Sequence, residues 1–200
     1  MTVAVDSNTV AYLPLATDLV DVISSNAWAS TGSPSISADG LFLDGVNDYL
    51  TIGPLGSLTD FSVEFYAKLP SLSSVGLLNS AADAFVLSTS SAGALRFAHD
   101  GGTLYSIAAA FSAETFCHVF IGRSESNTYL ALNGQLSKII TDWSTAVNLT
   151  GMWFGKHYNG SMFFSYTLKD LRISNICRYT ASFTPPTFGD DSLARRRQVV

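Results

Sequence analysis

The chain has 200 residues, of which 47% are hydrophobic and only 14% are charged, and its formal net charge is −5. This length fits a single β-sandwich domain, and the acidic balance excludes nucleic acid as the main partner, because phosphate contacts need clustered Lys and Arg. No stretch has the length and apolarity of a membrane span, so we expect no membrane partner. Because typical domains are about 25% charged, we expect part of the apolar content to lie on the surface and contact other protein chains.

The first half of the chain predicts short strands. Turn-forming residues recur every few positions in residues 1–40, which leaves room only for short strands there. Residues 41–52 contain two apolar runs with Asp-Gly and Asn-Asp pairs between them, which predicts a β-hairpin. Residues 61–68 alternate between apolar and polar side chains, as in a strand with one buried face and one exposed face.

Further short strands follow at the spacing of a β-sandwich, and no segment has the pattern of a long amphipathic helix. The strongest turn signal is Asn133-Gly134, which predicts a hairpin between the strands on either side of it. The remaining strands are predicted at residues 85–89, 95–99, 104–110, 117–123, 128–132, 135–140, 152–155 and 168–174. The predicted fold is therefore all-β, with two packed antiparallel sheets.

The two prolines at the end of residues 178–186 remove backbone donors, so we expect the sheet to close before them and the chain to leave it there. The predicted organisation is an N-terminal arm at residues 1–11, a sandwich at residues 12–186 and a C-terminal arm at residues 187–200. The C-terminal arm carries Arg195, Arg196 and Arg197, which we expect to bind carboxylates of a partner protein. The alternative is that they fold back onto the acidic surface of the same chain.

The sequence offers no catalytic constellation. Glycosidases of sandwich folds need two carboxylates across the substrate, but Glu64, Glu114 and Glu125 have no acidic residue two positions away in a strand. No G-x-S-x-G motif supports Ser-His-Asp chemistry, and His118, within an apolar strand, is predicted to be a structural hydrogen-bonding residue. We therefore expect a protein that is not an enzyme.

Cys117 and Cys177 belong to no metal-binding pattern, and we expect buried thiols rather than a disulfide. Pairing would require Cα atoms within about 7 Å.

Several motifs, in their order along the chain, resemble the concanavalin A-like jelly roll in its laminin-G/pentraxin-like form. They are LDG at 43–45, DYL at 48–50, FSVEF at 61–65, FCHV at 116–119, LALNG at 130–134 and LKDLRI at 168–173. Tyr66 stands where the family commonly has Trp, and Asn133 replaces Asp. The resemblance implies a two-sheet antiparallel jelly-roll sandwich with a lectin-like surface. The ending RYTASFTPP at 178–186 resembles the terminus of such domains in tailed-phage virion proteins.

Asp44, Asn47 and Asp48 cluster in one predicted turn and are the candidate ligands of a calcium ion, which relatives often hold in loops. Calcium needs six to eight oxygen ligands, whereas Asp, Asn and Gly are also the ordinary residues of tight turns. We therefore expect no metal and no cofactor.

Candidate sugar-binding residues are Trp143, Tyr158 and Asn159, because rings in loops beside an amide suit a glycan. Trp143 has an equally weighted alternative as a cap on the core.

These observations favour a structural virion protein of a bacteriophage, made in the host cytoplasm because the N-terminus shows no secretory signal. We expect capsid decoration or cement as its role, with the major capsid protein or neighbouring copies as partners in a homo-oligomer. The alternative is the receptor-binding module of a tail fibre or spike, which grips host polysaccharide through Trp143 and Tyr158. A third interpretation is a cellular lectin-like domain.

Overall fold

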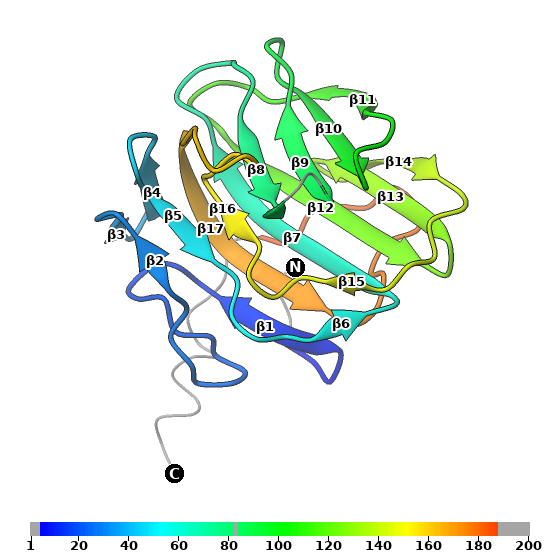
Figure 1. Ribbon diagram of the computed structural model, residues 1–200, viewed down its shortest axis with the longest axis horizontal. Coiled ribbons are helices and arrows are strands. Elements are labelled where there is room, and N and C mark those ends of the chain that lie inside the picture. The colour runs from blue at the N-terminus through cyan, green and yellow to red at the C-terminus, as the bar shows by residue number, and fades with distance from the viewer. Residues whose placement is uncertain (1–4, 82–83, 188–200) are drawn as a thin grey trace.

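The computed structural model describes residues 5–81 and 84–187, and it consists of two antiparallel β-sheets packed face to face (Figure 1). No α-helix occurs in these two ranges, and therefore none that could span a membrane. The predicted fold class, a two-sheet antiparallel jelly-roll sandwich, is confirmed.

One sheet contains β1 (Thr9–Leu13), β3 (Ser35–Ser37), β4 (Gly40–Asp44), β7 (Phe61–Lys68), β12 (Phe116–Ser124), β13 (Asn127–Leu132), β14 (Gln135–Ile140) and β17 (Ser165–Ser174). Its strand order is β14-β13-β12-β7-β17-β4-β3, and β1 also pairs with β17. We call it the eight-stranded sheet. β17 is central, since β7 lies along one side of it and β4 and β1 share the other side.

The second sheet contains β2 (Ser30–Thr31), β5 (Tyr49–Thr51), β8 (Gly76–Asn79), β9 (Phe85–Thr89), β10 (Ala94–His99), β11 (Tyr105–Ala110) and β16 (Trp153–Phe154). Its order is β11-β10-β9-β8-β16-β5-β2, and we call it the seven-stranded sheet. β6 (Ser57–Leu58) and β15 (Val147–Asn148) form a separate two-stranded pair.

The core lies between the two sheets and is rich in aromatic rings. Phe65 of β7 meets Phe154 of β16 edge to face, with ring centroids 5.3 Å apart, so this pair joins one sheet to the other. Phe85 and Phe97 pack in the same way at 4.9 Å. All four rings are buried, and each contributes roughly 1.5–3 kcal/mol through removal of apolar surface from water.

The predicted hairpin at Asn133-Gly134 is confirmed, because β13 and β14 pair directly across it. Asn133 has φ of 50° and Gly134 has φ of 78°, the left-handed pair of angles that a two-residue hairpin turn requires. A Cβ atom on Gly134 would lie 1.9 Å from the carbonyl oxygen of Phe183. Glycine is therefore needed here for its size as well as for its backbone conformation.

The predicted hairpin at residues 41–52 is wrong, because β4 and β5 lie in different sheets. β4 pairs with β17, β5 pairs with β16, and residues 45–48 carry the chain from one sheet to the other. The carboxylate of buried Asp48 accepts backbone N–H groups of Ser33 at 2.7 Å and Asp44 at 3.2 Å. The Asp-Gly and Asn-Asp signals were correct for a tight turn, but turns that cross between sheets use the same residues.

The chain does not leave the sheet where its prolines occur. Residues 175–187, here called the covering segment, run back over the outer face of the eight-stranded sheet. The ring of Phe183 packs against His118 and Phe120, each at 5.7 Å, and its backbone N–H donates to the carbonyl of Gly134 at 3.0 Å. The Tyr66 hydroxyl donates to the carbonyl of Pro186. β17 ends at Ser174, well before the prolines, and the apolar rings hold the segment on the sheet.

This cover explains why β7 differs from its prediction. Its polar alternate positions were expected to face solvent, yet Ser62, Glu64 and Tyr66 are all buried. The sheet therefore has protein on both faces of β7, with the core on one side and the covering segment on the other.

The N-terminal boundary of the sandwich also differs from the prediction. β1 begins at Thr9, inside the region assigned to an arm, because Thr9 pairs with Ser174 of β17. Arg178 of the covering segment then binds the carboxylate of Asp6 at 2.7 Å, so residues near both ends of the described chain are joined.

Candidate functional site

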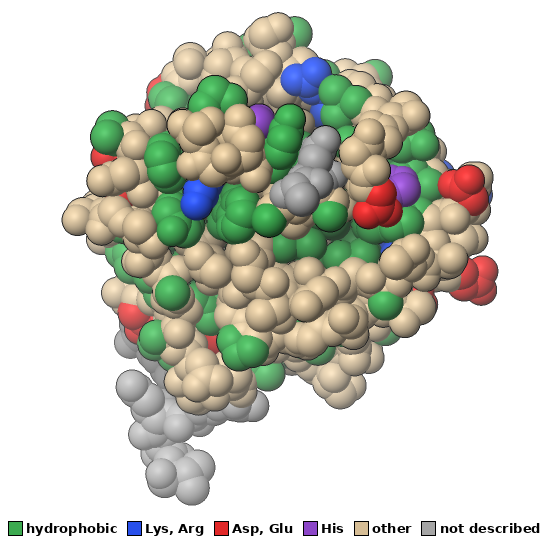
Figure 2. Space-filling view, viewed as in Figure 1, with side chains coloured by type: hydrophobic (Ala, Val, Ile, Leu, Met, Phe, Trp, Pro, Cys, Tyr) green, Lys and Arg blue, Asp and Glu red, His purple; other side chains and the backbone are tan. Residues whose placement is uncertain are grey.

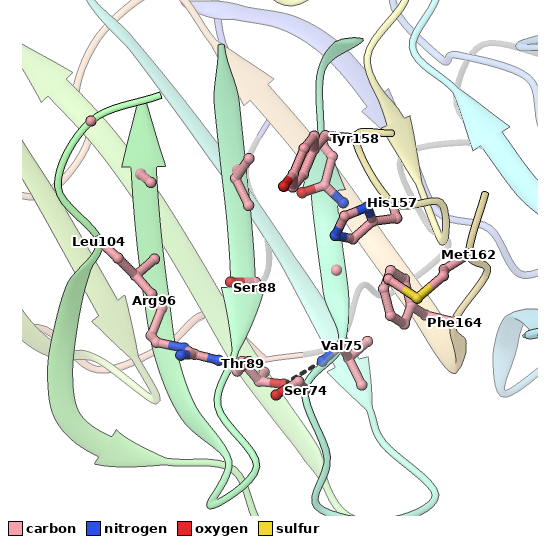
Figure 3. Close-up of a pocket in the computed structure, with 15 residues that line it drawn as sticks. Ser74, Val75, Ser88, Thr89, Arg96, Leu104, His157, Tyr158, Met162 and Phe164 are labelled. Carbon is pink, nitrogen blue, oxygen red and sulfur yellow. Dashed lines mark hydrogen bonds between the residues drawn. The ribbon is translucent and has the colours of Figure 1, made fainter. Parts of the chain in front are cut away.

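The outer face of the seven-stranded sheet carries a groove of about 480 Å³, within the range of small-molecule sites. The groove is lined by Ser74, Val75, Gly76, Asn79, Val86, Ser88, Thr89, Arg96, Ala98, Gly102, Leu104, His157, Tyr158, Met162 and Phe164 (Figure 3). Its floor comes from β8, β9 and β10, and its sides come from the connections around them.

The β16–β17 loop, residues 155–164, supplies one side of the groove, and Leu104 lies on the other side with Ser88 between them (Figure 3). The rings of His157 and Tyr158 lie together, with centroids 4.1 Å apart. The amide of Asn79 fastens this loop to β8, because its Nδ2 donates to the carbonyl of Lys156 at 2.7 Å. The groove therefore has an aromatic side that is anchored to its floor.

Two polar atoms of groove residues have no hydrogen-bond partner among the described residues. They are Oδ1 of Asn79, whose side chain is 1% exposed, and Nε of Arg96. A buried polar group without a partner costs about 1–3 kcal/mol, so such atoms are uncommon in folded proteins. Both atoms belong to residues that line the groove.

The surface around the groove is poor in charge, as the composition predicted. On the face that Figure 2 shows, hydrophobic side chains lie among uncharged polar groups and only a few charged side chains. Two of the large hydrophobic side chains that are exposed, Leu104 at 47% and Met162 at 48%, belong to the groove.

Of the predicted sugar-binding residues, Tyr158 lines the groove but Trp143 does not. Trp143 is only 6% exposed and belongs to the core, where its ring stacks on His99 at 4.5 Å and contacts Phe97 at 5.6 Å. It lines a different hollow of about 360 Å³. Trp143 thus packs in the core, as its alternative interpretation expects, and the structure does not bring Trp143 and Tyr158 into one site.

Asn159 shapes the loop rather than the groove wall. Its Oδ1 accepts the backbone N–H and the hydroxyl of Ser161, at 3.0 and 2.8 Å, and its own N–H donates to Nδ1 of His157 at 3.3 Å. Asn159 thus orients the His157 ring that borders the groove.

Two of the three candidate calcium ligands, Asp44 and Asp48, act as turn caps. Asp44 Oδ1 accepts the N–H of Val46 at 2.8 Å, and both oxygens of Asp48 accept backbone N–H groups. In the described ranges, no group of three His, Cys, Asp or Glu side chains is arranged to hold a metal ion.

A second polar cluster is sealed beneath the covering segment. Glu64 accepts Nε2 of His118 at 3.1 Å and Nε of Arg172 at 2.7 Å, and all three side chains are buried. Burial alone would raise the pKa of Glu64, but the hydrogen bond from His118 and the charge of Arg172 lower it below its ordinary value. His118 hydrogen-bonds within this buried cluster, the kind of contact that was predicted for it.

Both cysteines are free thiols, Cys117 buried and Cys177 half-buried. Burial raises the pKa of Cys177 to about 11. Arg195, Arg196 and Arg197, the predicted partner-binding residues, lie outside the described residues.

The sequence analysis missed Asn79, Arg96 and His157 as groove residues. The sequence shows Arg96 only as a polar position within the alternating strand β10. The structure adds that β10 pairs with β9, which places Arg96 beside Ser88.

Comparison with known families and structures gives one sequence match and many structural ones. The sequence profile described as the concanavalin A-like lectin/glucanases superfamily matches residues 44–182. A search among curated proteins finds no significant match.

The structural matches share the fold at low identity. Trypanosoma rangeli sialidase in complex with sialic acid aligns with a TM-score of 0.68 at 13% identity, over 88% of this chain and 32% of the sialidase. Domain 4 of AbnA, an extracellular arabinanase from Geobacillus stearothermophilus, aligns in its arabinotriose complex with a TM-score of 0.59 at 13% identity, over 90% and 96% of the two chains. A botulinum neurotoxin type C structure, titled for its interaction with two ganglioside molecules, aligns with a TM-score of 0.60 at 13% identity, over 86% and 49%.

The chain thus spans about a third of the sialidase but nearly all of the arabinanase domain. The sequence profile covers more than half of the residues, and the two-sheet topology agrees with it. The chain belongs to the concanavalin A-like lectin/glucanase superfamily.

Proposed function

We propose that the protein is a carbohydrate-binding module without catalytic activity, which holds a glycan in the groove over β8, β9 and β10. The observation that carries the proposal is the combination of the Tyr158 ring on one side with the polar side chains of Ser88 and Arg96 on the floor. Sugar rings present apolar C–H faces that pack on aromatic and aliphatic side chains, and hydroxyls that need fixed polar partners. The groove offers both kinds of contact.

The carboxylates of the chain support binding rather than hydrolysis. A glycosidase places two carboxyl groups on opposite sides of the scissile bond, whereas the described lining of the groove contains no Asp or Glu. Glu64 is 2% exposed and already accepts bonds from His118 and Arg172.

Structural relatives give the proposal support by analogy of fold. The arabinanase domain, which this chain covers almost completely, is titled as a complex with arabinotriose, and the neurotoxin structure is titled for ganglioside interaction. A module of this size and fold can therefore bind carbohydrate by itself.

A glycan array with the purified protein tests the proposal, followed by titration calorimetry on the best ligand. Tyr158→Ala should weaken that binding about ten-fold or more, because it removes a large aromatic ring from the side of the groove. Tyr129→Ala is the matched control, since Tyr129 is a half-buried tyrosine on β13 of the other sheet. Equal affinity of the two variants would place the glycan elsewhere, and an array without hits would refute the proposed function.

A second proposal concerns where the module works, namely on the virion of a tailed phage. The RYTASFTPP ending supports it, and so does exposed apolar surface at one edge, where Phe42 of β4 is 42% exposed and Val46 is 70% exposed. With a glycan groove, a tail fibre or spike module that binds host polysaccharide fits better than capsid decoration.

Particle binding tests this second proposal. The purified protein should co-sediment with particles of the phage that encodes it, and deletion of residues 195–200 should lower its occupancy if Arg195, Arg196 and Arg197 are the anchor. Occupancy unchanged by the deletion would remove these arginines from the contact, and absence of the protein from purified particles would remove the virion role.

A further inference from the structure

The groove differs in charge from the protein as a whole. The chain has a formal net charge of −5, yet the described residues that line the groove include Arg96 and no Asp or Glu. A negatively charged ligand in the groove would therefore be attracted by the positive charge of Arg96, and it would not be repelled by any carboxylate of the described lining.

Among the described residues, no carboxylate pairs with the positive charge of Arg96. Its Nη2 donates to the carbonyl of Thr89 at 2.6 Å, and its Nε is buried without a partner. The backbone bond orients the guanidinium on the floor, beside β9. A guanidinium is planar and only donates hydrogen bonds, whereas a carboxylate is planar and only accepts them. The two groups are therefore complementary, and a sulfate is also a suitable acceptor.

A second donor comes from the opposite side of the groove. Nδ1 of His157 accepts the backbone N–H of Asn159 at 3.3 Å, so the neutral ring carries its proton on Nε2. The ionisable side chains of the lining are Arg96, His157 and Tyr158. Each of them offers an N–H or O–H group, so an acceptor-rich ligand is favoured.

We propose that the glycan held in this groove is acidic, with a carboxylate or sulfate group placed at Arg96. This inference rests on the proposed carbohydrate binding and adds the chemical class of the ligand.

The test begins with an array that presents neutral, uronate- or sialate-bearing and sulfated glycans. We expect the bound glycans to be acidic, and the carboxylate and sulfate sets separate the two sources of charge. Calorimetry then compares the best acidic glycan with its carboxyl-reduced or desulfated counterpart, which should bind about ten-fold more weakly or worse. The affinity for the acidic glycan should also fall as NaCl is added, because salt screens the charge.

Arg96→Gln should weaken binding of the acidic glycan about as much as removal of the ligand's charge does. Arg96→Lys should bind the acidic glycan more tightly than Arg96→Gln but less tightly than the wild type. Lys138→Gln is the matched control, because it removes one positive charge from β14, where Lys138 contacts Asn127 far from the groove lining. Melting curves establish that each variant is folded, and the comparison of charged and uncharged ligands needs no variant at all.

The outcomes separate the two proposals. Binding of neutral and acidic glycans with equal affinity would overturn the inference about charge and leave carbohydrate binding intact. A folded Arg96→Gln variant with unchanged affinity for the acidic glycan would also overturn it, and an array without hits would overturn both.

Discussion

Arg172 donates from Nε to Oε1 of Glu64 at 2.7 Å, although the two side chains are only 4% and 2% exposed. Removal of one partner from a buried ion pair leaves the other charge without compensation, which typically costs about 3–5 kcal/mol. Glu64→Gln should therefore lower the free energy of unfolding by roughly that amount, as measured by urea denaturation at neutral pH.

The matched control for this variant is Asp39→Asn, which removes one carboxylate from an exposed turn. It should change the free energy of unfolding by less than about 0.5 kcal/mol. If Glu64→Gln lowered the free energy of unfolding as little as the control, the ion pair would contribute little to stability. The covering segment would then be held on the sheet by its apolar rings alone.

The same pair predicts how stability depends on pH. The pKa of Glu64 is lowered from its ordinary value of 4.5 because His118 and Arg172 outweigh the effect of burial, and Arg178 lies 3.9 Å from the same carboxylate. A group with a depressed pKa stabilises the folded state above its unfolded pKa, and this contribution disappears as pH falls through the folded value.

We therefore expect the difference in unfolding free energy between the wild type and Glu64→Gln to be constant above about pH 5 and to shrink below about pH 4. Urea titrations at a series of pH values measure it. A difference that persists unchanged at about pH 2 would mean that the Glu64 charge is not its source.

Trp143 provides a contrast with Tyr158. Its ring lies among core aromatics and under the guanidinium of buried Arg123 at 4.8 Å, so Trp143→Ala should cost about 3–5 kcal/mol of stability. Trp143→Phe keeps most of the apolar contact and should cost less, which leaves a folded protein for binding studies.

Because Trp143 is outside the groove lining, the Phe variant should bind glycan as the wild type does. Denaturation and calorimetry on the same samples separate the two effects. A loss of affinity without a loss of stability would return Trp143 to the role that the sequence first suggested.

The features that sequence alone predicts here depend on local chemistry. Asn133-Gly134 specifies its turn through two left-handed backbone angles, and the strands on either side of it pair directly across that turn. The alternation of residues 61–68 likewise identified β7. These signals involve neighbours in the chain, and they fixed the fold class and most strand positions.

Features that depend on distant segments were not predictable in the same way. The turn at Asp44 was assigned to a hairpin because nothing in residues 41–52 tells that β17 and β16 are the true partners of the two strands. The polar face of β7 was assigned to solvent because a buried Glu64 becomes acceptable only with His118 and Arg172 brought to it.

The groove illustrates the same limit for the candidate site. Tyr158 and Trp143 were both chosen because they lie in loops rather than in alternating strands, and of the two only Tyr158 lines the groove. In the sequence, Arg96 is an ordinary strand residue. It becomes a candidate binding residue only because the fold places it in the groove without a carboxylate beside it among the described residues.

The central position of β17 has a consequence for biosynthesis. It is the last strand among the described residues, yet β7 pairs with one side of it and β4 and β1 with the other. While the ribosome is still translating the preceding segments, those three strands have open edges with no partner on that side. The nascent polypeptide therefore cannot complete this sheet strand by strand, and native folding of the sandwich waits until β17 itself has been synthesised.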